Sequence, residues 1–310
     1  MTSGPVTVSV LAPAKVNLFL HVVGRREDGY HLLDSLVVFA GTGDRLDLRP
    51  ADDLSLDITG PGAAVPGLAD DNIVLRAARR LAEAAGIAPR AAITLDKRLP
   101  VAAGVGGGSA DAAATLRGLV RLWGLAVPEP DLAALGLALG ADVPVCLRGQ
   151  PTAVSGIGEH LASVPPLPPA WLVLVNPGRP LATPAVFRAR AASGAPFSAA
   201  APLTTSPVDA AALAAALDER RNDLTAAARA LEPAVGEVLD RLERLDGCLL
   251  ARMSGSGATC FGLFADETTA RAAEATLTAA RPDWWTVAAA LVHSLSPSRG
   301  RGSGRGGGAT

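Results

Sequence analysis

Apolar and polar residues alternate along much of the first sixty residues, which predicts that the chain begins with a β-sheet. Alternation with a period of two is typical of strands that bury one face. The pair Asp28-Gly29 supplies a turn between two of these segments. The predicted strands are 6–11, 16–23, 32–39, 45–48 and 54–58.

Helical spacing of apolar residues follows at 73–85. Asn72 is a suitable N-cap for this helix, and Gly86 is a suitable stop. Thr183-Pro184 has the form of an N-cap followed by proline at the first helical position. The other predicted helices are 109–123, 131–139, 209–219, 222–245 and 267–280, and the later strands are 91–95, 171–175, 258–264 and 286–292.

Strands and helices are mixed along the chain, which indicates the α+β class. Glycine and proline cluster at 149–169, where we expect a short hairpin near Gly156 and Gly158 and a domain boundary. We therefore expect an N-terminal domain over 1–158 and a C-terminal domain over 159–295. Residues 296–310 are rich in Gly, Arg and Ser and contain no large apolar residue, so we expect a disordered tail.

Composition excludes several classes of protein. The 310 residues are 49% hydrophobic and only 19% charged, which excludes a largely disordered chain. The net charge of −2 argues against a dedicated nucleic-acid binder. Three widely spaced cysteines form neither a disulfide framework nor a metal motif, and each is expected to be a small core residue. No signal peptide or membrane span is evident, so we expect a cytoplasmic protein.

The clearest chemical motif is the glycine-rich loop over 100–110, between a predicted strand and a predicted helix. Glycine lets backbone N–H groups approach a polyanion, and the start of the following helix carries partial positive charge. The loop lacks the Gly-Lys-Ser/Thr of a Walker A motif. Its position 109 is serine rather than the third glycine of a dinucleotide-binding fingerprint. We interpret it as a phosphate-binding loop.

Three segments together resemble the galactokinase–homoserine kinase–mevalonate kinase–phosphomevalonate kinase (GHMP kinase) superfamily. They are the glycine-rich loop, the N-terminal run APAKVNL and the C-terminal run MSGSGATC. The runs APAKVNLFLHVVGRREDGYHLLDSLV, DKRLPVAAGVGGGSADAAA and LGADVPVCLRG are similar to one branch. Members of that branch phosphorylate 4-diphosphocytidyl-2-C-methyl-D-erythritol. The similarity spans about residues 8–295.

The resemblance implies a fold and a reaction. The N-terminal domain is expected to resemble domain 2 of ribosomal protein S5, and the C-terminal domain to be ferredoxin-like. The implied reaction transfers the γ-phosphoryl group of ATP, bound with Mg²⁺, to the C2 hydroxyl of the cytidine compound, in non-mevalonate isoprenoid biosynthesis. Catalysis of this kind depends mainly on positioning and charge stabilisation.

The resemblance also implies catalytic residues. Asp142, in GADVP, matches the aspartate that accepts the hydroxyl proton, although from the residues alone an aspartate at a turn or helix end is the favoured interpretation. Lys15 matches the lysine that pairs with this aspartate and steadies the transferring phosphoryl group. Asn17, two residues further along the same strand, lies on the same side and is expected to hold the substrate.

Four residues are implied in binding the cytidine end of the substrate. Tyr30, the only tyrosine, is expected to stack on one face of the cytosine and Phe187 on the other. His31 is expected to bind the polar edge of the base. From the residues alone, Phe187 also suits core packing and His31 a turn, and Thr183 either contacts the cytidine or caps a helix.

The remaining implied contacts are with ATP. Asn72, Ile73 and Lys97 are expected beside the adenine, and a second glycine-rich loop is expected to close over the nucleotide. We call Ser254, Gly255, Ser256 and Gly257 the closing loop. The metal ligands are not identified by the pattern. The phosphate loop comprises Pro100, Val101, Ala102, Ala103, Gly104, Val105, Gly106, Gly107, Gly108, Ser109 and Ala110.

Two other functions fit parts of the sequence. One is a related kinase that acts on a mevalonate derivative, homoserine or a sugar, but such a kinase has no need of Tyr30, His31 and Phe187. The other is a non-catalytic regulatory protein that contacts RNA through its tail, but the presence of both Lys15 and Asp142 opposes it. We therefore expect small-molecule partners, without membrane or specific nucleic-acid binding.

Overall fold

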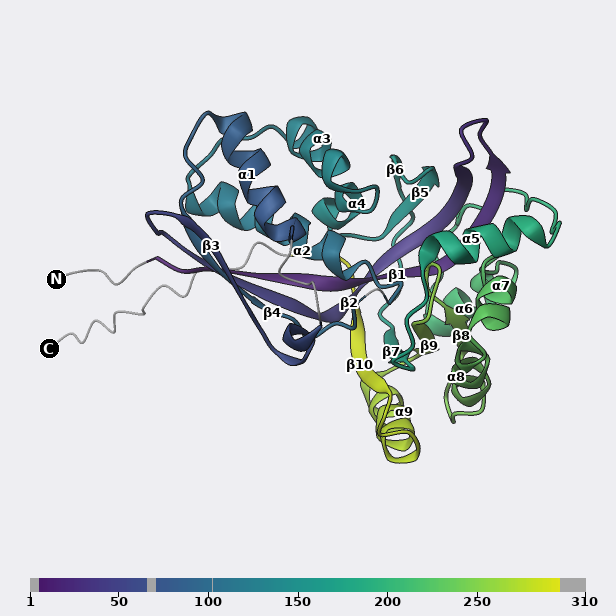
Figure 1. Cartoon of the computed structure of the whole chain (residues 1–310). Coiled ribbons are helices and arrows are strands. Elements are labelled where there is room, and N and C mark those ends of the chain that lie inside the picture. The colour runs from purple at the N-terminus through teal and green to yellow at the C-terminus, as the bar shows by residue number, and fades with distance from the viewer. Residues whose placement is uncertain (1–5, 66–70, 102, 296–310) are drawn as a thin grey trace, which may run out of the picture.

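The computed structural model describes residues 6–65, 71–101 and 103–295. Its longest feature is an antiparallel ribbon of two strands, β1 (Val8–Arg25) and β2 (His31–Arg49). Irregularities of register at Pro13/Lys15, Asn17/Phe19 and Val22/Gly24 bend the ribbon without ending it. The first four segments that alternation predicts as separate strands are therefore parts of two long strands, which cross the molecule in Figure 1, whereas 54–58 is a separate strand as predicted.

The rest of the N-terminal sheet is built on β2. Strand β4 (Ala91–Asp96) pairs antiparallel with β2 and parallel with β3 (Leu54–Thr59). Strand β5 (Thr152–Gly156) pairs with the other end of β2 and forms a hairpin with β6 (His160–Ser163). The predicted hairpin is confirmed. The boundary expected at 158 falls in its turn, with both strands in the N-terminal sheet.

Four α-helices lie over this sheet, above the ribbon in Figure 1. Helix α1 has the predicted ends: the Asn72 side chain accepts a hydrogen bond from the Val74 N–H, and Gly86 ends the helix in the left-handed region. Helix α2 begins at Gly107, before the expected Ser109, and α4 was not predicted. A 3₁₀ turn, η1 (Pro61–Ala64), follows β3. The helices are α1 (Ile73–Ala85), α2 (Gly107–Leu122), α3 (Glu129–Leu139) and α4 (Val143–Arg148).

A second antiparallel sheet forms the C-terminal half, in the order β10-β7-β9-β8. Strand β10 also pairs with β2 through Leu291 and Ala40, so the two sheets are continuous. Apolar residues of β1, β2, β7, β9 and β10 share one buried cluster between the halves. The strands are β7 (Trp171–Asn176), β8 (Leu250–Met253), β9 (Cys260–Phe264) and β10 (Trp285–Val292).

Five helices accompany this second sheet, and two sequence predictions about them are wrong. The helix predicted over 222–245 is two helices, because proline at 233 lacks the N–H that a continuous helix needs. The N-cap predicted at Thr183 is Ala182. The helices are α5 (Thr183–Ala192), α6 (Ala210–Asp218), α7 (Thr225–Leu231), α8 (Ala234–Glu243) and α9 (Glu267–Ala280).

The cysteines behave as the sequence predicts. All three are free thiols, and Cys146 and Cys260 are buried. Burial raises the pKa of Cys146 to about 12, so this thiol is not a ready nucleophile. Among the described residues, no helix is both long and apolar enough to cross a membrane. The predicted tail, 296–310, lies outside the described residues.

Candidate active site

Lys15 and Asp142 form an ion pair, with 3.0 Å between the Lys15 Nζ and an Asp142 carboxylate oxygen. Lys15 lies at an irregular point of β1 with its side chain only 6% exposed, whereas the Asp142 side chain is 43% exposed. The same ammonium donates to the Asn17 Oδ1 at 3.0 Å. A buried cation thus meets a solvent-accessible carboxylate at the surface of the N-terminal half.

Asp142 is held in place by the short helix that follows it. It is the residue directly before α4, whose Val143 and Val145 are buried in the core. The Arg117 guanidinium, on α2, donates to the Cys146 carbonyl at 2.9 Å and ties α4 to α2. The Asp142 side chain makes no capping hydrogen bond to α4, so its carboxylate is available to Lys15 and to a substrate.

The phosphate loop lies against Lys15. The Lys15 N–H donates to the Val105 carbonyl at 2.9 Å, which joins β1 to the loop. Gly106 precedes α2 with φ of 63°, and a Cβ there would come within 3.0 Å of the Lys15 Cε. The first N–H groups of a helix have no acceptor within it, and they carry partial positive charge. The start of α2 therefore offers an anion-binding position beside the Lys15 ammonium.

The closing loop contacts the phosphate loop backbone to backbone. A Cβ at Gly104, whose φ is 75°, would lie 2.6 Å from the Gly257 carbonyl oxygen, so no larger residue fits. The Ser254 hydroxyl donates to the Gly104 carbonyl at 3.2 Å and accepts from the Asn17 N–H at 3.1 Å. The structure thus brings together all three segments that carry the resemblance.

Asn17 connects these parts through both ends of its side-chain amide. Its oxygen accepts from Lys15, and its nitrogen donates to the Ser35 hydroxyl at 2.8 Å. Ser35 then donates to the Phe19 carbonyl at 2.6 Å. Ser35 was missed by the sequence analysis; the only signal was a polar residue within the apolar alternation of β2. This chain of bonds fixes the orientation of the Asn17 amide.

The residues expected around the cytosine lie near the end of the β1–β2 ribbon. The rings of His31 and Phe187 stack on each other, with centroids 5.1 Å apart and planes 30° apart. Tyr30 is 62% exposed, next to the hairpin turn. Thr183, in the first turn of α5, shares a hydrogen bond of 2.7 Å with the Ser256 hydroxyl. Thr183 therefore joins α5 to the closing loop.

The pKa of His31 is lowered from its usual value. Burial is the main cause, and the positive charges of Arg25 and Arg190 act in the same direction. The ring is therefore neutral at pH 7, with one nitrogen that donates and one that accepts. A neutral imidazole can bind a base edge that presents both a donor and an acceptor.

Lys97 is not free to reach into an open site. Its Nζ lies 2.5 Å from Asp44 and 2.6 Å from Asp111, and all three side chains are almost fully buried. Asp44 also accepts from the Arg98 and Leu99 N–H groups at 2.6 and 2.7 Å. We call Lys97, Asp44 and Asp111 the buried triad. Through these bonds the triad holds residues 97–99, directly before the phosphate loop.

Opposing effects set the pKa values in the buried triad. Burial lowers the pKa of Lys97, but the charges and hydrogen bonds of Asp111 and Asp44 outweigh it, so the pKa is raised. Burial raises the pKa of Asp111, Lys97 lowers it, and Asp44 raises it again, to about 7. Asp111 Oδ1 has no hydrogen-bond partner among the described residues. No local pattern around Asp44 or Asp111 indicates this role.

The other residues expected near ATP occupy structural positions. Asn72 is the buried N-cap of α1, and Ile73 is half-buried at the first position of that helix. Ser109 is half-buried in the first turn of α2, and Val101 is exposed. Ala102 lies outside the described residues. Within the part of the chain that the structure describes, no group of three or more His, Cys, Asp or Glu side chains is arranged to hold a metal ion.

Asn222 supports the closing loop through its side-chain amide. Its side-chain nitrogen donates to the Met253 and Gly255 carbonyls, both at 2.8 Å. Its oxygen accepts from the Leu224 N–H at 2.9 Å. The sequence analysis placed residue 222 at the start of a helix and gave it no role. Its function depends on carbonyls far away in the sequence, which no local pattern reveals.

Two family models match the chain. The family described as GHMP kinases N terminal domain matches residues 72–150, and the family described as GHMP kinases C terminal matches residues 207–283. The first match includes the phosphate loop and Asp142. The second covers α6 to α9 and includes the closing loop.

Curated relatives match nearly the whole chain. A protein of Paramagnetospirillum magneticum named 4-diphosphocytidyl-2-C-methyl-D-erythritol kinase is 62% identical over 92% of this chain and 98% of its own length. A protein of Rhodospirillum rubrum with the same name is 60% identical over 91% of each chain.

Solved structures agree with these relatives. The crystal structure of a 4-(cytidine 5'-diphospho)-2C-methyl-D-erythritol kinase has a TM-score of 0.75 and 38% identity, covering 91% of this chain and 98% of that one. A homoserine kinase from Cytophaga hutchinsonii, at 19% identity and a TM-score of 0.69 over 95% and 97% of the two chains, shares the fold. The two-domain GHMP kinase fold expected from the sequence is confirmed. The chain belongs to the 4-diphosphocytidyl-2-C-methyl-D-erythritol kinase family of the GHMP kinases.

Proposed function

We propose that this protein transfers the γ-phosphoryl group of ATP to the C2 hydroxyl of 4-diphosphocytidyl-2-C-methyl-D-erythritol, giving the 2-phosphate and ADP. The observation that carries the proposal is the pair of Lys15 and Asp142, 3.0 Å apart beside the phosphate loop. An anion site, a cation and an accessible carboxylate are the parts that phosphoryl transfer to an alcohol needs.

Asp142 is the proposed proton acceptor. Its carboxylate is accessible, so a substrate hydroxyl can donate to it. As the hydroxyl oxygen forms its bond to the γ-phosphorus, its proton passes to Asp142 and the bond to ADP breaks. The carboxylate makes no bond to its own helix, so it can accept this proton without loss of a cap.

Lys15 is proposed to stabilise the negative charge that develops on the transferring group. Its ammonium is buried and held by Asn17, so little reorientation is needed during the reaction. The N–H groups at the start of α2 would bind the ATP phosphates on the same side. Ser254, which donates to Gly104, would order the closing loop over them.

The cytidine end would bind at the tip of the β1–β2 ribbon. We propose that Tyr30 and Phe187 stack on the two faces of the cytosine and that neutral His31 binds its polar edge. His31 and Phe187 stack directly on each other here, so the base would separate these two rings as it enters. Thr183 would contact the cytidine, and Asn17 would hold the rest of the substrate.

ATP is the phosphoryl donor of GHMP kinases, and we propose that it acts as its magnesium complex. Phosphate oxygens are ligands that Mg²⁺ prefers, and the ion neutralises charge on the β- and γ-phosphates. Pro100 to Ala110 would surround the phosphates. Asn72, Ile73 and Lys97 would lie on the adenine side, with Lys97 acting through the buried triad.

We propose that 1–158 and 159–295 work as two domains that enclose the substrates, with small molecules as partners; β6, just beyond this boundary, completes the sheet of the first domain. We also place the reaction in the cytoplasm, where ATP is available and where the three free thiols stay reduced. The tail, 296–310, has no part in this scheme.

The test is ADP release with ATP and Mg²⁺ on four alcohols: the cytidine compound, mevalonate, homoserine and galactose. We expect turnover on the cytidine compound alone. Turnover on another alcohol would keep the phosphate loop and Asp142 but would remove the roles of Tyr30, His31 and Phe187. A folded, ATP-binding protein without turnover on any of them would favour the regulatory alternative.

A further inference from the structure

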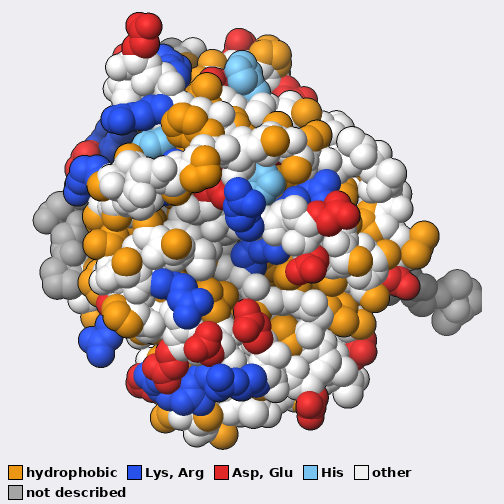
Figure 2. Space-filling model, turned by 90° about the vertical axis from the view of Figure 1, so that its right-hand side faces the viewer, with side chains coloured by type: hydrophobic (Ala, Val, Ile, Leu, Met, Phe, Trp, Pro, Cys, Tyr) orange, Lys and Arg blue, Asp and Glu red, His pale blue; other side chains and the backbone are white. Residues whose placement is uncertain are grey.

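A cavity lies beside the closing loop, since Asn222 in its wall donates to the Gly255 carbonyl. It has a volume of about 510 Å³, which is within the usual range for small-molecule sites. Figure 2 faces the side of the molecule that carries α5, α7 and α8, and shows Lys and Arg side chains around a hollow near the centre of this face. The charged side chains that line the cavity are Arg190, Arg221, Arg229, Arg252, Asp223 and Glu243.

The charges of this lining do not balance. Four arginines face two carboxylates, so the cavity has an excess of two positive charges. One carboxylate, Asp223, is already paired with Arg221 at 2.7 Å. Arg229 has only a long contact of 3.8 Å with Asp240, outside the cavity. The excess matches the charge of a phosphate monoester, which is close to a dianion at pH 7.

Two of the arginines are buried and form no ion pair among the described residues, although the negative charge of Asp218 acts on Arg252 from a distance. Arg190 is 97% buried; one guanidinium nitrogen donates to the Pro196 carbonyl, and its Nε has no acceptor in the described chain. Arg252 is 92% buried and donates only to the Leu18 and Leu217 carbonyls. Buried positive charge without a counter-ion costs free energy, and a bound anion would relieve that cost.

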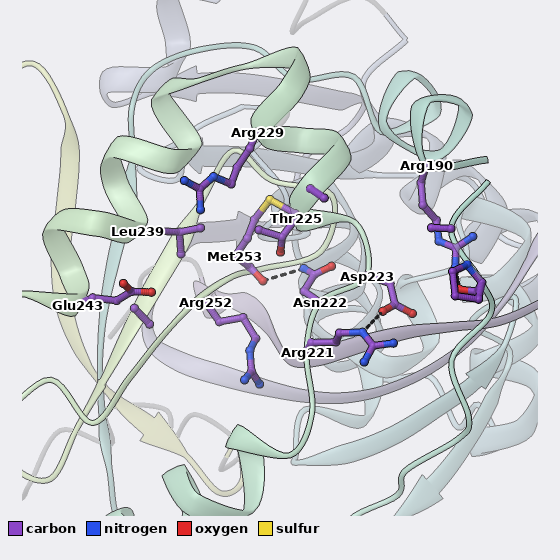
Figure 3. A pocket seen from close by; sticks show the side chains of 14 residues that line it. Arg190, Arg221, Asn222, Asp223, Thr225, Arg229, Leu239, Glu243, Arg252 and Met253 are labelled. Atoms are coloured by element: carbon purple, nitrogen blue, oxygen red, sulfur yellow. Dashed lines mark hydrogen bonds and ion pairs between the residues drawn. The ribbon is translucent and has the colours of Figure 1, made fainter. Parts of the chain in front are cut away.

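The rest of the lining is mainly apolar, with Asn222 and Thr225 as its uncharged polar residues. Figure 3 shows Arg229 and Arg190 on opposite sides of the cavity, with Met253 and Asn222 between them. Leu239, Ala251 and Met253 provide the apolar surface. A ligand that fits both parts has a dianionic head and a small apolar body.

Two residues that line the cavity, Asn222 and Arg190, also interact with parts of the active site. Asn222, in its wall, donates to the Gly255 carbonyl of the closing loop. Arg190 lies on α5 one helical turn after Phe187, and its charge contributes to the lowered pKa of His31. Groups in the cavity are thus bonded or electrostatically coupled to both substrate subsites.

We propose that this cavity binds a phosphate monoester with a small apolar body, and that its occupancy changes turnover through Asn222 and α5. The binding claim is independent of the reaction, whereas the effect on turnover rests on the proposed function. The two claims are therefore measured separately.

Binding is tested by calorimetry with n-butyl phosphate on the full chain, with ADP present in saturating amount to fill the phosphate loop. We expect one equivalent to bind. Replacing the exposed Arg229 by Gln should weaken binding about tenfold, and Arg190→Gln should weaken it at least as much. The matched control, Arg80→Gln, removes the same charge from an exposed position of α1 and should leave the affinity unchanged.

Three results would overturn the binding claim. One is no binding to the wild-type chain at millimolar n-butyl phosphate. Another is binding that neither Arg229→Gln nor Arg190→Gln weakens, with thermal melting used to show that each variant is folded. The third is equal affinity for butyrate. Because butyrate carries a single charge, we expect it to bind about tenfold more weakly than n-butyl phosphate, and we expect n-butanol not to bind.

The effect on turnover is tested by adding n-butyl phosphate to the ADP-release assay. We expect a saturable change of kcat in the wild type that shifts to about tenfold higher concentration in Arg229→Gln. Binding of n-butyl phosphate without any change of kcat would contradict the proposed coupling to turnover, but it would still support the binding site. Absence of turnover from the start would contradict the proposed function, while the calorimetry would still decide the site.

Discussion

The ammonium of Lys97 lies 2.6 Å from the Asp111 carboxylate, and both side chains are almost fully buried. Asp44 completes the triad at 2.5 Å from the same ammonium. One cation thus faces two carboxylates without solvent to screen them. Asp44 accepts two backbone N–H groups in addition to Lys97, and burial together with the nearby charge of Asp44 raises the pKa of Asp111 to about 7.

This arrangement predicts a pH dependence of stability. The pKa of Asp111 is about 7 in the folded chain and near its usual 3.8 in the unfolded one, so the folded state holds the proton more tightly. The stabilisation from that proton is complete below about pH 4 and is lost as the pH rises to about 7. Asp111→Asn removes this dependence.

The measurement is the free energy of unfolding by urea for both proteins between pH 4 and pH 8. The wild type should lose stability relative to Asp111→Asn by up to about 1.4 kcal/mol per pH unit between pH 4 and 7, and the difference should be constant above. A difference that does not vary with pH would show that Asp111 is ionised throughout.

Removing the other carboxylate should cost more. Asp44→Asn leaves Lys97 with one partner and weakens the bonds to the Arg98 and Leu99 N–H groups. Breaking a buried pair typically costs about 3–5 kcal/mol. Glu267→Gln, which breaks an exposed pair with Arg271 on α9, should cost less than about 1 kcal/mol. Equal effects on urea unfolding would contradict a structural role for the triad.

Asp142→Asn tests the chemical step. The variant keeps the shape of the side chain but cannot accept the hydroxyl proton, so kcat should fall by about 10²- to 10⁴-fold. The affinity for ATP, measured by calorimetry, should stay within about twofold, because Asp142 is proposed to contact the alcohol. Near-normal kcat would remove Asp142 from the mechanism.

The contact between the two glycine-rich loops is tested by Gly104→Ala. Its Cβ would lie 2.6 Å from the Gly257 carbonyl, so the closing loop must move away and ATP affinity should fall by about tenfold or more. Gly124→Ala is the matched control, because Gly124 also has positive φ, but a Cβ added there would meet no atom within 4 Å. If both variants bind ATP equally, the contact has no role in binding.

The aromatic residues are tested through KM for the cytidine compound. Tyr30→Ala and Phe187→Ala each remove a stacking surface worth about 1–3 kcal/mol, so KM should rise by about 5- to 150-fold. Tyr30→Phe keeps the ring and should change KM little. An unchanged KM in both alanine variants would mean that the base binds elsewhere.

The sequence predicted the parts of the site that depend on local residue patterns. Asn72 and Gly86 define the ends of α1 because capping is determined by nearby backbone groups. The role of Lys15 was implied by the resemblance alone, because a lysine between apolar strands is otherwise usually a solvated edge residue; the structure instead buries its side chain beside Asp142. These residues meet in the structure as the resemblance implied.

The sequence could not predict contacts between distant segments. Lys97 was expected beside the adenine, but its partner Asp44 comes from β2 and changes its surroundings. Asn222 binds carbonyls of the closing loop, which its helix-like context hides. The pattern Thr183-Pro184 predicts an N-cap at Thr183, but the N-cap of α5 is Ala182. The Thr183 hydroxyl instead forms a hydrogen bond with the Ser256 hydroxyl. In each of these cases, the position of the side chain depends on a hydrogen-bond or ion-pair partner that is distant in the sequence.

The most direct test of the proposed function is phosphorus NMR of a reaction containing ATP, Mg²⁺ and the cytidine compound. We predict one new phosphomonoester signal on the C2 oxygen, formed in equal amount with ADP and absent when Asp142→Asn replaces the wild type. Inorganic phosphate in place of that signal, or a phosphate on another hydroxyl, would contradict the proposed reaction.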